Sequence, residues 1–172
     1  MLIAVCADIH DNVWALARAL VRVGRADALI VCGDLCAPFT LAQIAAGFPR
    51  QTHVVWGNND GDKWLLTREA ARHAHVHLHG DLAELELDGV RIAAHHYPEI
   101  ARRLAASGAY DLVCHGHDHT ALVATAGSAV LLDPGEVMGR FGRRTVGLFD
   151  TATRQAEIAD VEAAGAASSE FG

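Results

Sequence analysis

The sequence lacks an excess of positive charge. Its 172 residues contain 14 Lys and Arg against 21 Asp and Glu, which gives a formal net charge of −7. Nucleic acids and anionic membranes are normally bound by basic patches, so we expect neither strong nucleic-acid binding nor a membrane partner. An anionic substrate would have to be held by something other than Lys and Arg, and metal cations would serve.

The sequence also lacks long apolar runs and a basic leader. Its first apolar segment is short and is interrupted by Asp8, so neither a transmembrane segment nor a signal peptide is expected. Cys6, Cys32, Cys36 and Cys114 lie mostly within apolar runs, where a free cysteine behaves as a small hydrophobe. A thiolate metal pair or redox pair at the Cys-x3-Cys stays open, although zinc would need further partners. We expect a cytoplasmic location.

The composition is that of a folded globule. Hydrophobic residues make up 51% of the chain and charged residues 20%, which is enough to build a sizeable core. The length suits one domain, which we place at residues 1–161, followed by a flexible tail at 162–172 that is rich in Ala, Gly and Ser. Exposed apolar residues could serve a homo-oligomer.

The alternation of apolar runs and helical patterns predicts an α/β fold. The first half predicts strands at 2–7, 28–32 and 53–56, with helices at 13–23, 41–46 and 61–74. The second half predicts a helix at 99–106 and strands at 75–79, 82–87, 90–94, 111–114, 122–124, 129–132, 145–149 and 156–159. Two packed sheets with helices outside account for this order better than one open sheet.

Polar residues follow directly on several of the predicted strands. In α/β folds, ligands bind beyond the carboxyl ends of the strands, so we expect these residues to meet at one rim. Each motif alone has an ordinary explanation as a strand-end loop or turn, but the complete ordered set is hard to explain that way. The set consists of Asp8, His10, Asp34, Asn58, His95, His117 and His119.

This set offers nitrogen and oxygen ligands and no thiolate, which suits divalent metals such as manganese, iron, cobalt, nickel or zinc. Seven ligands are too many for one open ion but fit two ions that share a carboxylate. Asp34 has two oxygens that can each face a cation. Two metals about 3.5 to 4 Å apart can clamp the attacking and leaving oxygens of a phosphoryl displacement. We expect two divalent ions, with Mn2+ first and Ni2+, Zn2+, Fe2+ or Co2+ as alternatives.

The ordered motifs Asp-x-His, Gly-Asp, Gly-Asn-x-Asp, His and Gly-His-x-His resemble those of the calcineurin-like metallophosphoesterase superfamily. The short length and the sequence at 57–60 are similar to its small prokaryotic phosphodiesterase branch. The resemblance spans nearly the whole chain, from Asp8 to the region of Asp150. It implies a four-layered αββα sandwich of two mixed sheets flanked by helices.

The resemblance also implies a function and a set of roles. The implied enzyme is a dinuclear metal-dependent phosphodiesterase that hydrolyses a small phosphate ester by in-line attack of a metal-bound hydroxide. Asp34 would bridge the two ions. One ion would be held by Asp8, His10 and His119, and the other by Asn58, His95 and His117.

The sequence departs from the family pattern at Asn59, where many members carry a His that assists the leaving group. An amide cannot donate a proton as an acid, so diesters with good leaving groups are favoured over monoesters. His96 could be a substitute acid or a substrate contact, and we count it with Asp34 and Asn58 as candidate catalytic residues. It could instead only support its neighbouring ligand. We expect Asp60 to be an orienting carboxylate.

Two alternatives stay open. The chain could be a phosphomonoesterase or nucleotide phosphatase, if His96 replaces the missing acid. It could also be a non-catalytic scaffold, as implied by a retromer subunit that resembles this family. Four further histidines, at 73, 75, 77 and 79, alternate along a predicted strand. We expect them to line a solvated strand face.

Overall fold

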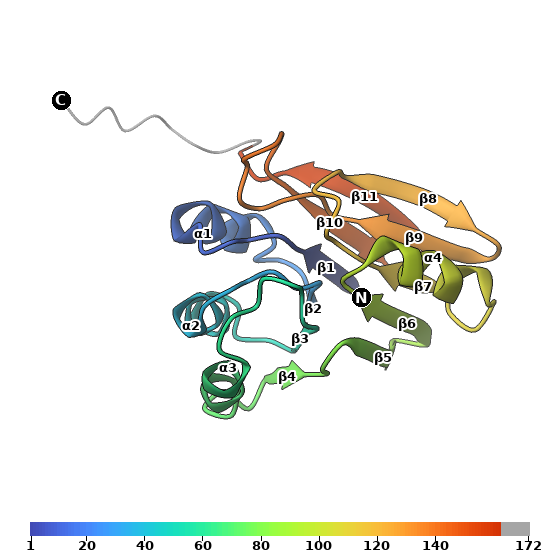
Figure 1. Ribbon diagram of the computed structural model, residues 1–172. Helices are drawn as coiled ribbons and strands as arrows, with labels where there is room; N and C mark the ends of the chain where they lie inside the picture. Colours follow the sequence, from blue (N-terminus) through green and yellow to red (C-terminus); the bar gives the residue numbers. More distant parts are fainter. Residues whose placement is uncertain (163–172) are drawn as a thin grey trace.

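The computed structural model describes residues 1–162 as two stacked β-sheets with helices on their outer faces (Figure 1). The first sheet has the order β11-β10-β1-β2-β3-β4 and the second the order β5-β6-β7-β9-β8. The first comprises β1 (Leu2–Cys6), β2 (Ala28–Val31), β3 (Thr52–Val54), β4 (Val76–Leu78), β10 (Thr145–Asp150) and β11 (Gln155–Asp160). The second comprises β5 (Leu82–Leu87), β6 (Val90–His95), β7 (Leu112–Cys114), β8 (Leu122–Ala126) and β9 (Ala129–Asp133).

Both sheets are mixed. Strands β1 to β4 run parallel, while β10 pairs antiparallel with β1 and β11 antiparallel with β10. In the second sheet β6, β7 and β9 run parallel, and the edge strands β5 and β8 are antiparallel to them. The predicted four-layered sandwich is confirmed.

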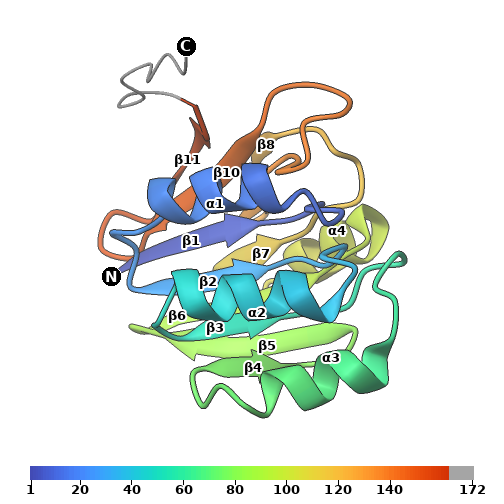
Figure 2. The ribbon, with the colours of Figure 1, turned by 90° about the vertical axis from the view of Figure 1, so that its left-hand side faces the viewer.

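Four helices cover the two outer faces. They are α1 (Val13–Arg22), α2 (Pro38–Gly47), α3 (Lys63–Ala70) and α4 (Pro98–Ala106). Helices α1, α2 and α3 lie side by side on the first sheet, and α4 lies on the second (Figure 2). None of the helices within residues 1–162 is long and apolar enough to cross a membrane.

The unbroken apolar runs of the sequence follow from burial on both faces of a strand. In β1, Ala4 and Cys6 pack against the helix layer, while Ile3 and Val5 pack between the two sheets. All four side chains are at most 3% exposed. Because the central strands are parallel, their carboxyl ends lie at one edge, and the polar residues that follow them meet there.

Several boundaries differ from the predictions. Helix α2 begins at Pro38, not at 41, because Pro38 is well placed at the first helical position. Helix α3 ends at Ala70, and β4 is only three residues long. The predicted tail lies outside the described residues except for Glu162, whose carboxylate pairs with Arg144 at 2.7 Å.

Candidate metal centre

A first group of predicted ligands gathers where β1 and β7 end. Asp8 and His10 follow β1, and His119 lies in the loop after β7. The Nε2 atoms of His119 and His10 are 3.6 and 3.9 Å from the same oxygen, Asp8 Oδ1. The two imidazole rings are stacked with their centroids 5.3 Å apart. These three residues present one ligand atom each within 4.8 Å of one another.

A second group lies where β3, β6 and β7 end. Asn58 Oδ1 is 2.9 Å from both His96 Nε2 and His117 Nδ1. These two ring nitrogens are 3.3 Å apart. Three electron-pair donors from three separate loops therefore crowd around one point.

Asp34, which follows β2, lies between the two groups. Its Oδ2 is 3.4 Å from His10 Nε2, and its Oδ1 is 3.6 Å from His96 Nε2. The side chain is 1% exposed. One oxygen thus faces each group, which is the placement that a shared carboxylate requires.

The placement of His95 and His96 is the reverse of the prediction. His95 is the last residue of β6 and pairs with Leu82. Its Nδ1 accepts a hydrogen bond from the Tyr97 amide at 3.0 Å, and none of its contacts among residues 1–162 joins the ligand groups. The strand runs one residue further than predicted, and since alternate residues face opposite sides, His96 points into the site instead.

Two imidazoles each use one ring nitrogen to donate a hydrogen bond, so the other ring nitrogen points its lone pair at an oxygen atom of a neighbouring residue. His96 Nδ1 lies 2.7 Å from the Cys32 carbonyl oxygen and must donate to it, so the neutral ring directs an unprotonated Nε2 at the Asn58 oxygen. His119 Nδ1 donates to Glu136 Oε2 at 2.9 Å, which leaves its Nε2 bare toward Asp8. Two lone pairs that face each other in this way repel each other unless a cation lies between them.

Two further observations fit divalent metal ions. Asp8 Oδ1 and His10 Nε2 are buried and have no hydrogen-bond partner among the described residues, which is costly for polar atoms without a ligand. Burial lowers the pKa of His10 and of His96. Neutral imidazoles are the form that binds metals.

Carboxylates and amides behind the ligands fix the loops. Asp60 accepts hydrogen bonds from the amides of Asp34, Cys36 and Gly57 at 3.1, 2.8 and 2.6 Å, which makes it the orienting carboxylate that was expected. Asn59 donates its side-chain amide to Asp34 Oδ2 at 2.7 Å and its backbone amide to Asp34 Oδ1 at 2.8 Å. The sequence showed that Asn59 is no acid but not that it binds Asp34.

Glu136 supports one of the predicted ligands. Its Oε2 accepts from His119, and its Oε1 accepts from the amides of Phe141 and Gly142 at 2.6 and 2.7 Å. Although burial opposes it, these hydrogen bonds keep the pKa of Glu136 below its usual range. A charged carboxylate behind a ligating histidine fixes the ring and raises its basicity. No local sequence pattern signals this contact, which joins two loops after different strands.

Two backbone features mark the site. Five of the predicted ligands have φ in the left-handed region, which is uncommon for residues other than glycine; they are Asp8 (53°), His10 (45°), Asp34 (55°), His117 (76°) and His119 (55°). Gly57 lies so close to Asp34 that a Cβ there would stand 2.1 Å from Asp34 Oδ1. The strand-end loops are therefore held in conformations dictated by the ligand positions.

The remaining cysteines and histidines form no comparable site. All four cysteines are free thiols, and burial raises the pKa of Cys36 to about 12, which disfavours the thiolate-pair alternative. The prediction that the four histidines line one strand face is wrong. Strand β4 spans only Val76–Leu78, so the alternation of side chains along the strand does not include His73 and His75. These two rings contact Glu69 and Ala45 on the helix side. On the other side, His53 Nδ1 lies 3.0 Å from His79 Nε2, and the ring of His53 stacks on His77.

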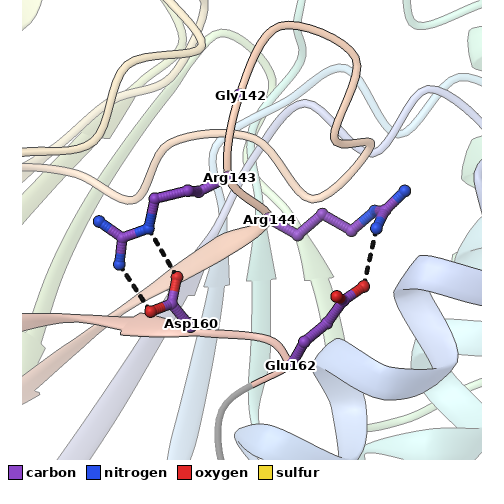
Figure 3. A pocket seen from close by; sticks show the side chains of 5 residues that line it. All are labelled: Gly142, Arg143, Arg144, Asp160 and Glu162. Carbon is purple, nitrogen blue, oxygen red and sulfur yellow. Dashed lines mark hydrogen bonds and ion pairs between the residues drawn. The ribbon is translucent and has the colours of Figure 1, made fainter.

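A surface pocket of about 350 Å³ is lined by Gly142, Arg143, Arg144, Asp160 and Glu162, none of which is a predicted ligand (Figure 3). Its charged lining residues are already paired. Arg143 binds Asp160 through two hydrogen bonds of 2.8 and 2.6 Å, and Arg144 binds Glu162 at 2.7 Å. The pocket thus contains no free charge of either sign to attract an ionic ligand.

The sequence is similar to that of known phosphoesterases. A family model described as the calcineurin-like phosphoesterase superfamily domain matches residues 1–154. A phosphodiesterase of Methanocaldococcus jannaschii, MJ0936, is 24% identical over 160 residues, which cover 90% of this chain and 96% of the relative. The residues matched by the family model include every strand-end loop described above.

Solved structures show the same fold. An archaeal phosphodiesterase superposes with a TM-score of 0.86 at 23% identity, covering 93% of this chain and 99% of its own. The phosphoesterase YfcE of E. coli has a TM-score of 0.65 at 16% identity, with coverage of 94% and 100%. Vps29 of Entamoeba histolytica also has a TM-score of 0.65 at 16% identity, with coverage of 93% and 99%. At these identities the likeness establishes the fold.

Proposed function

Because the chain belongs to the calcineurin-like phosphoesterase superfamily, we propose that it is a dinuclear metal-dependent phosphodiesterase that acts on a small phosphate ester. The observation that carries the proposal is the placement of Asp34, which directs one oxygen at each of two groups of lone-pair donors. The name of the relative from M. jannaschii, a phosphodiesterase, supports the same reaction class.

In this proposal Asp34 contributes to both sites. The first site consists of Asp8, His10 and His119, and the second of Asn58, His96 and His117. When bound, two divalent ions would supply Lewis acidity toward the phosphate oxygens and would lower the pKa of water toward neutrality. Glu136 holds His119 in the tautomer that leaves Nε2 free, and the Cys32 carbonyl does the same for His96.

The preference for diesters rests on the absence of a suitable acid. Asn59 is engaged with Asp34, and His96 has one nitrogen on a carbonyl and the other among the ligands. We therefore propose His96 as a ligand and not as an acid. An ester whose leaving group needs no protonation is the better substrate for such a site.

Manganese as the first metal, a cytoplasmic location and a homo-oligomer remain predictions.

The test is hydrolysis of bis-p-nitrophenyl phosphate and of p-nitrophenyl phosphate by metal-stripped protein, titrated in turn with manganese, nickel, zinc and magnesium. We expect diester turnover that requires metal and saturates near two ions per chain. Asp34→Asn and His117→Asn should each lower turnover at least about 100-fold, because each removes a charge or an imidazole from the site. Undiminished turnover in both variants would refute the proposal.

His95 and His96 provide a matched pair for the ligand assignment. His96→Ala should reduce the bound metal from two ions to one, measured by elemental analysis after gel filtration. His95→Ala should retain both ions, because the hydrogen bond and the ring contact of the His95 side chain are both made with Tyr97 and not with a ligand group. Preferred monoester turnover would instead favour a phosphatase, and stoichiometric metal binding without hydrolysis would favour a scaffold.

A further inference from the structure

Two exposed aromatic side chains stand against the imidazoles of the metal centre, one at each ligand group. The ring of Tyr97 lies edge-on to that of His117, with 4.8 Å between centroids, and 5.3 Å from that of His96. The ring of Phe141 lies edge-on to that of His119 at 5.1 Å. Tyr97 is 40% exposed and Phe141 is 69% exposed. Large apolar rings exposed beside a buried polar cluster indicate a binding surface more than scattered ones do.

The backbone of both residues is fixed relative to the ligands. The Phe141 amide donates to Glu136 Oε1 at 2.6 Å, and the other oxygen of this carboxylate holds His119. The Tyr97 amide donates to His95 Nδ1 at 3.0 Å, and Tyr97 occupies the N-cap position of α4, directly before Pro98. Both rings are exposed. The Phe141 amide is linked to His119 through Glu136, and the Tyr97 ring contacts the rings of His96 and His117 directly.

The chemistry of the two rings indicates what they would bind. Both rings lie edge-on to imidazoles, and both are exposed, so part of each ring is open to a further group. Aromatic side chains stack on flat unsaturated rings with little dependence on the identity of the ring. The guanidinium of Arg140 lies over the Phe141 ring, 5.4 Å from its centroid, which places a cation beside this ring.

We propose that Tyr97 and Phe141 select phosphate esters that carry a flat unsaturated ring, an aryl group or a nucleobase, on the ester group that is not displaced. The inference rests on the proposed function, because the phosphorus has to lie at the metal centre for the remaining ester group to reach either ring. It specifies the substrate class that the metal ligands alone leave open.

The experiment uses three p-nitrophenyl phosphodiesters with the same leaving group, whose second ester group is ethyl, phenyl or the 5′-oxygen of thymidine. With the metal-loaded protein we expect kcat/KM for the phenyl or thymidine ester to exceed that for the ethyl ester at least about tenfold. A preference for both ring esters indicates flat rings in general, and a preference for thymidine alone indicates nucleosides. Equal kcat/KM for all three would overturn the proposal.

Variants assign the preference to the two rings. Tyr97→Ala and Phe141→Ala should each reduce the ratio of ring ester to ethyl ester about three- to tenfold, and the ratio cancels any general loss of activity. Tyr97→Phe keeps the ring and should keep the ratio. Phe141→Leu keeps an apolar side chain without a π-face and should lose it. An unchanged ratio in both alanine variants would refute the assignment.

A binding measurement separates this inference from the proposed function. Calorimetric titration of the metal-loaded protein with phenyl phosphate and with ethyl phosphate needs no turnover. If none of the esters is hydrolysed, the proposed function fails, but tighter binding of phenyl phosphate that Phe141→Ala removes still supports ring selection. Equal affinity for the two phosphates would contradict it.

Discussion

Replacement of Gly57 by alanine tests the geometry of the metal centre most directly. A Cβ at Gly57 would lie 2.1 Å from Asp34 Oδ1 and 2.4 Å from the Asp34 amide nitrogen. Ordinary van der Waals contact begins at 3.4 Å, so the loops after β2 and β3 would have to separate by roughly 1 Å. Gly57 is absent from the described residues with positive φ, so alanine meets only the contact and no backbone strain of its own.

We expect Gly57→Ala to affect turnover more than stability. A misplacement of about 1 Å in a catalytic group costs about 100-fold in rate. Overpacking of this kind costs about 1–3 kcal/mol, which for a chain of this size lowers Tm by roughly 3–10 °C. The measurements are diester kcat/KM, the number of bound ions per chain and thermal unfolding followed by circular dichroism.

The control is Gly61→Ala in the same loop. A Cβ at Gly61 would come no closer than 3.4 Å to the Cys36 carbonyl oxygen, so this variant should keep turnover within about twofold and Tm within about 2 °C. If Gly57→Ala retained normal turnover and two bound ions, the contact between the two loops would not position Asp34, and the reasoning would be wrong.

Two further predictions concern charged and titratable groups. Glu136→Gln should weaken metal binding about 10- to 100-fold, because His119 loses its charged partner, as judged by chelator competition against the exposed control Glu157→Gln. Acid should destabilise the fold through His53, since burial and the neighbouring rings of His79 and His77 lower its pKa to about 4 from 6.5. The unfolded chain takes up this proton first, so stability is unaffected above pH 6.5 and falls between 6.5 and 4 by on the order of 2 kcal/mol, after allowance for partial screening at the surface. Urea unfolding of His53→Leu should show a shallower loss over this range, and an identical loss would contradict the assignment.

The sequence was sufficient for the fold and for the placement of Asp8 and His10 at the end of one strand, because both depend on local signals. Apolar runs buried on two faces give the parallel strands, and Asp8 and His10 follow β1 within a few residues. Whether His95 or His96 faces the site depends on the residue at which β6 ends. The sequence pattern cannot locate a strand end to within one residue, and here two adjacent residues are both histidines.

The supporting contacts were beyond the reach of sequence reasoning for a different reason. Glu136 meets His119 across 17 positions, and Asn59 meets Asp34 across 25. Neither pair shares a helix face or a strand register, so no periodicity connects them. Their partners are set by how far each loop extends beyond its strand, which depends on the packing of the two sheets.

The left-handed backbone of the ligand residues has a consequence for how the centre should be probed. At Asp8, His10, Asp34, His117 and His119, φ lies between 45° and 76°, a region that disfavours alanine but that asparagine enters several times more readily than most residues. An alanine scan would therefore combine two effects, the loss of the ligand side chain and a shift of the backbone away from its left-handed conformation. An asparagine variant reports the loss of the original ligand with little backbone strain. A glycine variant at the same position reports the loss of the whole side chain. The difference between the asparagine and alanine variants at one position would measure how much of the centre's shape is imposed by the chain before any ion binds.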